Sequence, residues 1–365
     1  MRARKRIIAT VTNDLSYDQR MIRICSTLVE LGFEVCLVGR QRKNSRPLVD
    51  RPFQQKRLPC WFDKGKLFYL EYNIRLFFYL LFNRFDIVNA VDLDTILPAY
   101  LISNWKGKDC IYDAHEYFTE MPEVIRRPLV KKVWEWVADF TIPKVDACYT
   151  VGPELARIMG ERYGVHFGVL RNVPFSQEVI KEQSPKGSLR LLYQGALNEG
   201  RGLEALIQAM EQLPNVQLWI AGEGDLSQQL RVDVDARGLA SQVQFLGYLQ
   251  PEELKKVTLQ ADIGLNLLEA KGLSYYYSLA NKAFDYIQAG LPSIHMNFPE
   301  YQTINQSYKV FHLLENLKVE TIVKGIQYFQ NYPDFYEQLH QNCLKARKEL
   351  NWEKEKAQLH TFYKG

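Results

Sequence analysis

The sequence has few cysteines, and none of them lies in a C-x-x-C pair. The 365 residues include six cysteines, scattered along the chain: Cys25, Cys36, Cys60, Cys110, Cys148 and Cys343. This spacing excludes a zinc ribbon and a dithiol redox motif. Unpaired thiols are typical of a reducing compartment, so we expect a cytoplasmic protein without disulfides.

A long hydrophobic run is also lacking. No stretch reaches the roughly 18 uncharged apolar residues that cross a bilayer, and the nearest one, residues 67–85, is interrupted by Glu71, Arg75 and Arg84. The basic start, MRARKR, resembles the first region of a signal peptide, but the apolar run behind it turns polar at residues 12–14. We therefore predict that this run is the first buried strand.

The chain also lacks a large excess of charge of one sign, because its net charge is only +4. Residues 1–175 carry 27 lysines and arginines against 20 aspartates and glutamates, a net +7, whereas the remainder carries 19 against 22, a net −3. We predict no nucleic-acid partner, and no obligatory protein partner is evident. The basic first half favours an anionic acceptor or an anionic membrane face.

One helical pattern, near residues 66–83, is more apolar than a surface helix usually is. Burial against the first sheet is one interpretation. The other is peripheral contact with the cytoplasmic face of a membrane, which would give access to a lipid-linked or polysaccharide acceptor. Both interpretations stay open at this point.

Short apolar runs alternate with helical patterns along the chain. In the first half, a less regular Arg- and Lys-rich loop precedes the aromatic helix, and the run 110–115 precedes a long helix near 123–141. The pattern restarts at 190–195, after a polar stretch, 173–188, that we interpret as a linker. This alternation predicts an α/β protein with two doubly wound domains, and the cleft between them is the default ligand site.

Three loops after strands of the second half are candidate ligand contacts. Arg201 lies between a strand that ends at Gly195 and a helix, where a guanidinium and backbone N–H groups can bind a diphosphate. Further along, Gly222 with Glu223, and then Tyr248, can meet a ribose or a base. A plain surface turn is the alternative interpretation of each loop.

A fourth loop opens the helix that ends at Gly290. Lys282 and Asp285 lie one turn apart in it, and a helix N-terminus favours anions. The carboxylate of Asp285, one turn into the helix, can accept hydrogen bonds from a ribose diol. The alternative is a surface Lys–Asp pair. Three more residues near the helix start are candidate contacts: Ser278, Leu279 and Asn281.

Two polar clusters follow strands of the first half. Asp113, His115 and Glu116 cluster at the carboxyl end of the run 110–115, and His115 is the one histidine at a strand end among acidic residues. A histidine that is satisfied within the core is the alternative. The second cluster, after the first strand, can contact an acceptor or form a structural network; it holds Asp14, Asp18 and Arg20.

With these loops placed, the chain resembles the GT-B glycosyltransferases of family 4. The motifs that carry the resemblance run through nearly the whole chain in order: YDAHE, VLRNVP, YQGALNEGRGLEAL, WIAGEGDL, VQFLGYLQPEEL and SLANKAFDYIQAGLPSI. The resemblance implies two Rossmann-like domains that face each other across a cleft, over residues 1–173 and 174–345. It also implies a C-terminal helix, within 346–365, that crosses back to the first domain.

The resemblance implies roles for three residues. His115 matches a histidine near the transferred sugar, Arg201 matches the basic residue that neutralises the donor diphosphate, and Asp285 matches the second glutamate of a pair that binds the ribose. Three features depart from the family. The Gly-Gly turn after the first strand is absent, and TNDLS (12–16) stands in its place. Tyr277 stands in place of the first glutamate, and Ala196 stands in place of an additional arginine, whose charge Lys282 can supply.

We therefore expect a hexosyltransferase that moves a sugar from a UDP- or GDP-linked donor to an acceptor hydroxyl of a polysaccharide, lipid-linked or small-molecule glycan. The resemblance implies retention of configuration, and no D-x-D motif for a metal is evident, so we expect neither metal nor cofactor. The catalytic residues would be His115, Arg201 and Lys282. The alternatives are a sugar-nucleotide epimerase of the same fold and a non-catalytic binding protein.

Overall fold

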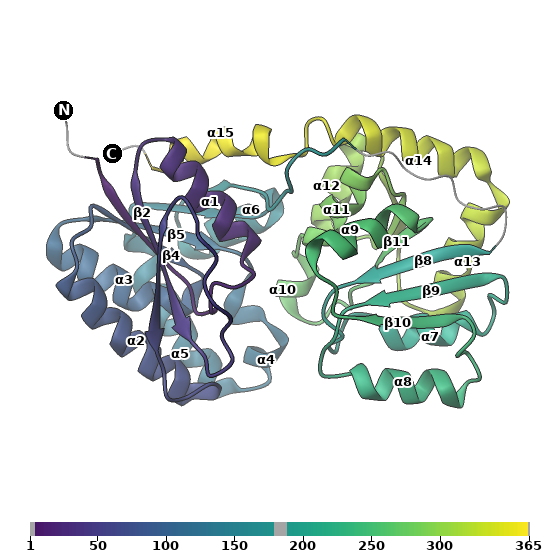
Figure 1. Cartoon of the computed structure of the whole chain (residues 1–365), viewed down its shortest axis with the longest axis horizontal. Helices are drawn as coiled ribbons and strands as arrows, with labels where there is room; N and C mark the ends of the chain where they lie inside the picture. Colours follow the sequence, from purple (N-terminus) through teal and green to yellow (C-terminus); the bar gives the residue numbers. More distant parts are fainter. Residues whose placement is uncertain (1–3, 179–187, 364–365) are drawn as a thin grey trace. The chain divides into compact units, whose positions relative to one another are not determined.

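The computed structural model describes residues 4–178 and 188–363, which form two compact units (Figure 1). The first unit comprises the described residues up to Asn172 together with those from Glu355 onward, and the second comprises the described part of Val173–Lys354. Residues 179–187 of the predicted linker lie outside the described residues.

The described part of the first unit contains a seven-stranded parallel sheet with the order β3-β2-β1-β4-β5-β6-β7. Its inner strands are short apolar runs, as expected when helices cover both faces. The chain moves outward from β1 and from β4 in opposite directions, so α1 and α3 cover opposite faces. The strands are β1 (Arg6–Thr10), β2 (Glu34–Gln41), β3 (Gln54–Pro59), β4 (Ile87–Val91), β5 (Asp109–Ala114), β6 (Ala147–Thr150) and β7 (Phe167–Val169).

The helices of this unit follow the predicted pattern with one correction. The single helix predicted near 123–141 is two helices, because Pro128 has no N–H to donate and opens a new helix behind Arg127. The helices are α1 (Gln19–Glu30), α2 (Gly65–Phe82), α3 (Leu93–Lys106), α4 (Pro122–Ile125), α5 (Pro128–Thr141) and α6 (Pro153–Tyr163).

The edge strand β3 lies where we expected an irregular loop. Its sequence, QQKRLP, is polar and has no apolar run, because an edge strand is exposed along much of its length. It pairs with β2 from Gln54 opposite Cys36 to Pro59 opposite Gln41.

The described part of the second unit contains a six-stranded parallel sheet with the order β10-β9-β8-β11-β12-β13. Its strands are β8 (Leu189–Gln194), β9 (Val216–Ala221), β10 (Val243–Gly247), β11 (Ile263–Asn266), β12 (Ser293–Met296) and β13 (Phe311–Leu314). The helices are α7 (Leu203–Met210), α8 (Ser227–Ala236), α9 (Pro251–Gln260), α10 (Gly272–Tyr276), α11 (Asn281–Ala289), α12 (Pro299–Tyr308), α13 (Val319–Asn331) and α14 (Pro333–Ala346).

The last helix, α15 (Trp352–Phe362), packs on the first unit with its C-terminal part. The ring of Phe362 stacks on Tyr149 of β6 with the ring centroids 4.7 Å apart, and Tyr149 and Tyr363 share a hydrogen bond of 3.1 Å between their hydroxyls. Gly168 leaves room for this helix, because a Cβ there would lie 2.2 Å from the Phe362 ring. The predicted return of the C-terminal helix to the first domain is confirmed.

In both sheets the strand order reverses direction at one point, between β1 and β4 and between β8 and β11. Ligands of doubly wound proteins bind outside the carboxyl ends of the strands at this point. The candidate residues of each unit lie at the carboxyl ends of the strands, in the loops that follow them or in the first turns of the next helices.

Candidate functional site

Three glycines end adjacent strands of the second unit. Gly195, Gly222 and Gly247 follow or close β8, β9 and β10 with φ angles of +133°, +146° and +66°. The Gly195 N–H donates to Ala221 at 2.9 Å, and the Gly222 N–H donates to Gly247 at 2.8 Å. A Cβ on Gly222 would lie only 1.9 Å from the carbonyl oxygen of Gly195, so this close approach of two backbones requires glycine.

Lys282 lies in the first turn of α11, and its side chain is only 8% exposed. Its Nζ lies 3.9 Å from the centre of the Tyr193 ring and beside Gly195. Burial lowers the pKa of Lys282 well below its usual value, and the nearby charge of Arg201 lowers it further, while Asp285 opposes both effects. Within the described residues, Lys282 forms no ion pair, and the Tyr193 ring lies beside its amine.

Arg201 is the second cation of this loop cluster. Its guanidinium lies 4.9 Å from the centre of the Tyr275 ring, and its Nε is buried without a hydrogen-bond partner among the described residues. The next residue, Gly202, has φ of +67° and turns the chain into α7. The charge of Arg201 lowers the pKa of Lys282, and a bound anion would favour the protonated form of the lysine. Such a pair is suited to an anion with two charged groups.

Among the remaining candidates of α11 and of the turn before it, hydrogen bonds hold Asp285 and Ser278 in place. Gln194 donates to the Asp285 carboxylate at 2.8 Å and accepts from Thr258 at 3.2 Å. Ser278 donates to the Tyr275 carbonyl at 2.8 Å, so its hydroxyl closes the turn before the helix. Leu279 is buried, whereas Asn281 is exposed at the first position of α11.

Two of the candidate nucleotide contacts lie at the surface. Glu223 pairs with Arg231 of α8 at 2.7 Å, and hydrogen bonds from Arg231 and Ser227 lower its pKa. Tyr248 is 57% exposed at the end of β10. Their roles toward a base or ribose stay predictions.

Two of the departures from the family pattern, Tyr277 and Ala196, occupy aromatic or exposed surroundings. Tyr277 caps the short helix α10, and its ring lies edge-on to Tyr276, which packs against Phe298. Ala196 is exposed, and its carbonyl accepts a hydrogen bond from the Tyr193 hydroxyl at 2.8 Å. At Tyr277 an aromatic ring therefore stands where the family pattern has a carboxylate.

In the first unit, a buried ion pair fixes the end of β5. Asp113 is 0% exposed and accepts from Arg20 at 2.8 Å, while Arg20, 3% exposed, also donates to the Leu170 carbonyl at 2.9 Å. Burial alone would raise the pKa of Asp113, but the charges of Arg20 and His115 lower it to about 2. Arg20 thus has a structural role, and its contact with an acceptor stays a prediction.

His115 lies between two carboxylates. Its Nε2 is 3.3 Å from Asp113 and its Nδ1 is 3.5 Å from Asp92, whose other oxygen accepts from the His115 backbone N–H at 2.9 Å. Burial opposes protonation, yet the two aspartates raise the pKa of His115 to about 9. The ring is therefore an imidazolium at neutral pH, and it can donate a hydrogen bond but cannot accept a proton.

Sequence reasoning missed Asp92 and Asp94, which follow β4. Asp92 has φ of +57°, which is rare for a residue other than glycine, and this conformation places its carboxylate beside His115. Asp94 is buried and accepts from Thr12 at 2.7 Å; burial and the charge of Asp92 raise its pKa to about 8. The signal was available, because Asp92-x-Asp94 is a D-x-D doublet directly after the buried apolar run that forms β4. The expectation that no such motif is evident in the sequence was therefore wrong.

The other first-unit candidates lie around this cluster. Asp18 caps α1 by accepting from the Met21 N–H at 2.9 Å, and Asp14 accepts from the Ser16 N–H in its own loop and from the Ser45 hydroxyl in the loop after β2. Glu116 is half-buried, and its charge contributes to the raised pKa of Asp94. The described residues contain no group of three or more His, Cys, Asp and Glu side chains arranged to hold a metal ion.

The raised pKa of His115 predicts a pH-dependent stability. A histidine whose pKa rises from 6.5 to about 9 on folding contributes stability that is complete below pH 6.5 and is lost as the pH rises through about 9. His115→Gln should remove this contribution, at most ~3 kcal/mol. Urea unfolding at a series of pH values measures it.

Asp94 adds its own pH dependence over part of this range to the wild type and to His115→Gln alike. The difference in unfolding free energy between these two proteins therefore reports on His115. The exposed His166→Gln is the matched control and should leave the profile unchanged. An identical fall in stability with and without His115 would show that the imidazolium does not stabilise the fold.

Two family models match the chain. Residues 175–346 match the model of glycosyl transferases group 1, and residues 19–174 match the model of glycosyltransferase family 4. The chain belongs to the family 4-like, group 1 glycosyltransferases. A comparison with curated protein sequences gave no match.

Solved structures support the fold of this glycosyltransferase at low sequence identity. Sucrose-phosphate synthase from Thermosynechococcus elongatus has a TM-score of 0.81 and 15% identity, over 99% of this chain and 98% of that one. Anabaena HepE in complex with UDP-glucose has a TM-score of 0.78 and 11% identity, over 98% of each chain. WaaG, a glycosyltransferase involved in lipopolysaccharide biosynthesis, has a TM-score of 0.73 and 14% identity, over 98% of this chain and 100% of that one. The fold is GT-B, as the sequence predicted.

Proposed function

We propose that this glycosyltransferase transfers a hexose from a UDP- or GDP-linked donor to a hydroxyl of a glycan or lipid-linked acceptor. The observation that carries the proposal is the cation pair of the second unit. The charge of Arg201 acts on Lys282, and neither residue forms an ion pair within the described residues. A nucleoside diphosphate supplies the missing negative charge. The likeness to Anabaena HepE, which is described in complex with UDP-glucose, fits such a donor.

In the proposed reaction, Arg201 and Lys282 stabilise the diphosphate as it leaves the sugar. Charge that develops on a leaving group is stabilised most strongly by groups that are already fixed and shielded from water. Lys282 meets this condition because α11 holds it, 8% exposed, beside Tyr193. Two fixed cations can carry this role, so we propose a metal-independent transfer. Asp285, one turn further along α11 and held by Gln194, would accept hydrogen bonds from the ribose.

The protonation of His115 bears on the stereochemical course. An imidazolium with a pKa of about 9 does not serve as a general base at neutral pH. The proton of the acceptor hydroxyl then goes to another group, and the leaving phosphate is the proposed acceptor, as in a retaining transfer. His115 would donate a hydrogen bond to the sugar. On the acceptor side we propose Asp14, Glu116 and the protonated Asp94.

The thiols support a proposal for the compartment. All six cysteines are free, which fits a reducing environment. We propose that the transfer takes place in the cytoplasm.

The experiment that tests this function measures release of nucleoside diphosphate from UDP-glucose, UDP-N-acetylglucosamine and GDP-mannose during long incubations. We expect release from at least one donor, slowed by a factor of ~100 or more in Arg201→Ala, the loss typical when a group that stabilises developing charge is removed. Arg237→Ala is the control, because Arg237 is paired at the surface with Glu211 and Asp233. No release from any donor, together with no rise in melting temperature with UDP, GDP or ADP, would contradict the proposal.

A further inference from the structure

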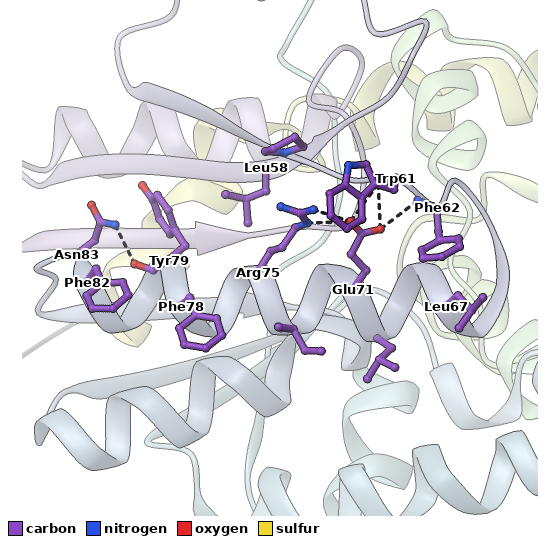
Figure 2. Close-up of a pocket in the computed structure, with 13 residues that line it drawn as sticks. Leu58, Trp61, Phe62, Leu67, Glu71, Arg75, Phe78, Tyr79, Phe82 and Asn83 are labelled. Carbon is purple, nitrogen blue, oxygen red and sulfur yellow. Dashed lines mark hydrogen bonds and ion pairs between the residues drawn. The ribbon is translucent and has the colours of Figure 1, made fainter.

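Helix α2 has apolar side chains on two opposite sides. One side packs into the first unit through Phe68, Tyr72, Leu76 and Leu80, which are all buried. The opposite side is exposed and carries a second apolar stripe at helical spacing: Leu67, Leu70, Ile74, Phe78 and Phe82. Phe82 is 79% exposed, and its ring stacks on Phe78 at 6.4 Å (Figure 2). A surface helix of a soluble protein needs only the buried stripe to pack on its own domain.

The loop before α2 extends this exposed surface. Trp61 is 82% exposed, yet it is held firmly, because Glu71 accepts hydrogen bonds from the backbone N–H groups of Trp61 and Phe62 at 2.9 to 3.0 Å. Arg75 pairs with Glu71 at 2.8 Å and lies 4.9 Å from the centre of the Trp61 ring (Figure 2). The charges of Glu71 and Arg75 neutralise each other, and the two side chains together hold the Trp61 indole in position.

Together, the loop and the helix enclose an apolar groove of about 710 Å³ (Figure 2). We call this surface the α2 face and define it by the exposed stripe of α2 with Trp61 and Phe62. Exposed apolar surface of this extent marks an interaction site rather than ordinary surface.

Cations flank the α2 face at both ends. Lys64 and Lys66 are exposed at the start of α2, and Arg84 is exposed just beyond its end, whereas Asp63 is the one exposed carboxylate in 61–84. An apolar centre between basic ends is the arrangement of helices that lie in the interface of an anionic bilayer. A protein partner would not require basic residues at both ends, so the charges favour a lipid surface.

We propose that the first unit docks on an anionic lipid surface through the α2 face. Phe78, Phe82 and Trp61 would enter the boundary between headgroups and acyl chains, and Lys64, Lys66 and Arg84 would contact the phosphates. None of the helices in the described part of the chain is long and apolar enough to cross a membrane, so this contact would be peripheral. If the proposed function holds, the contact brings the enzyme to lipid-linked acceptors.

Sedimentation with vesicles tests the proposal without any donor or acceptor. At low salt, we expect the protein to sediment with phosphatidylglycerol vesicles and much less with phosphatidylcholine vesicles. Ile74→Asp combined with Phe78→Asp should lower partitioning by at least about tenfold, because each removes an apolar side chain and adds a charge. The combined reversal of Lys64, Lys66 and Arg84 to glutamate should weaken binding to phosphatidylglycerol alone.

The matched control is Val232→Asp, because Val232 is 62% exposed on α8 of the second unit. This variant should sediment like the wild type. No sedimentation with phosphatidylglycerol vesicles at low salt would overturn the proposal, and so would unchanged sedimentation of the Ile74 and Phe78 variant. A dimer in analytical ultracentrifugation that Phe78→Asp dissociates would instead identify the α2 face as an interface between copies. Release of nucleoside diphosphate, measured separately, distinguishes each of these results from a failure of the proposed transfer.

Discussion

Replacing Lys282 by methionine is expected to stabilise the protein and, at the same time, to remove its affinity for nucleoside diphosphates. The ammonium is 8% exposed and lacks a carboxylate partner within the described residues, so burial lowers its pKa well below the usual value. A lysine with a lowered pKa costs folding free energy at every pH below its unfolded pKa, because the unfolded chain binds the proton more tightly. Methionine keeps the apolar stem without the charge, and we expect a gain of ~1–4 kcal/mol.

The affinity should change in the opposite direction. A buried cation that meets a phosphate contributes ~2–5 kcal/mol, so the Kd for UDP or GDP should rise by a factor of ~30 to several thousand. Melting temperature and calorimetric titration measure the two effects on one preparation. Lys324→Met, on the exposed side of α13, is the control and should change neither value. A less stable variant with unchanged affinity would show that Lys282 has only a structural role.

Replacing Asp113 by alanine is expected to destabilise the first unit severely, by ~3–5 kcal/mol. The variant leaves the Arg20 guanidinium, 3% exposed, with only the Leu170 carbonyl as its partner, and it also removes one of the two carboxylates beside His115. Urea unfolding measures the loss. Asp139→Ala is the control, because Asp139 pairs with Arg162 at the surface and such pairs contribute ~0–1 kcal/mol.

A double variant separates the loss of the pair from the loss of the carboxylate. Asp113→Leu with Arg20→Met removes both charges and keeps apolar volume, so it should recover much of the stability that Asp113→Ala loses. A double variant as unstable as the single one would mean that the cost arises elsewhere, for example at His115.

Most of the fold could be predicted from the sequence because buried parallel strands are continuous apolar runs. The runs 110–115 and 190–195, for example, form β5 and β8. The errors have physical causes. The edge strand β3 has no apolar run, and the break before Pro128 is a local backbone effect inside a pattern that stays amphipathic.

The candidate site was predicted in part, because strand ends can be located from the sequence alone. Arg201, Lys282 and His115 were singled out at strand ends or helix starts, and the structure places each beside a second charged group. Their partners could not be predicted. Arg20 meets Asp113 across 93 positions of the chain, and only the fold shows that this arginine is buried.

The central claim is that Arg201 and Lys282 bind the diphosphate of the sugar donor. Calorimetric titration of the wild type, Arg201→Ala and Lys282→Met with UDP and with GDP tests it most directly. We expect the wild type to bind one of the two nucleotides and each variant to bind it at least ~30-fold more weakly. Equal affinity in all three proteins, or no binding of either nucleotide to the wild type, would contradict the claim.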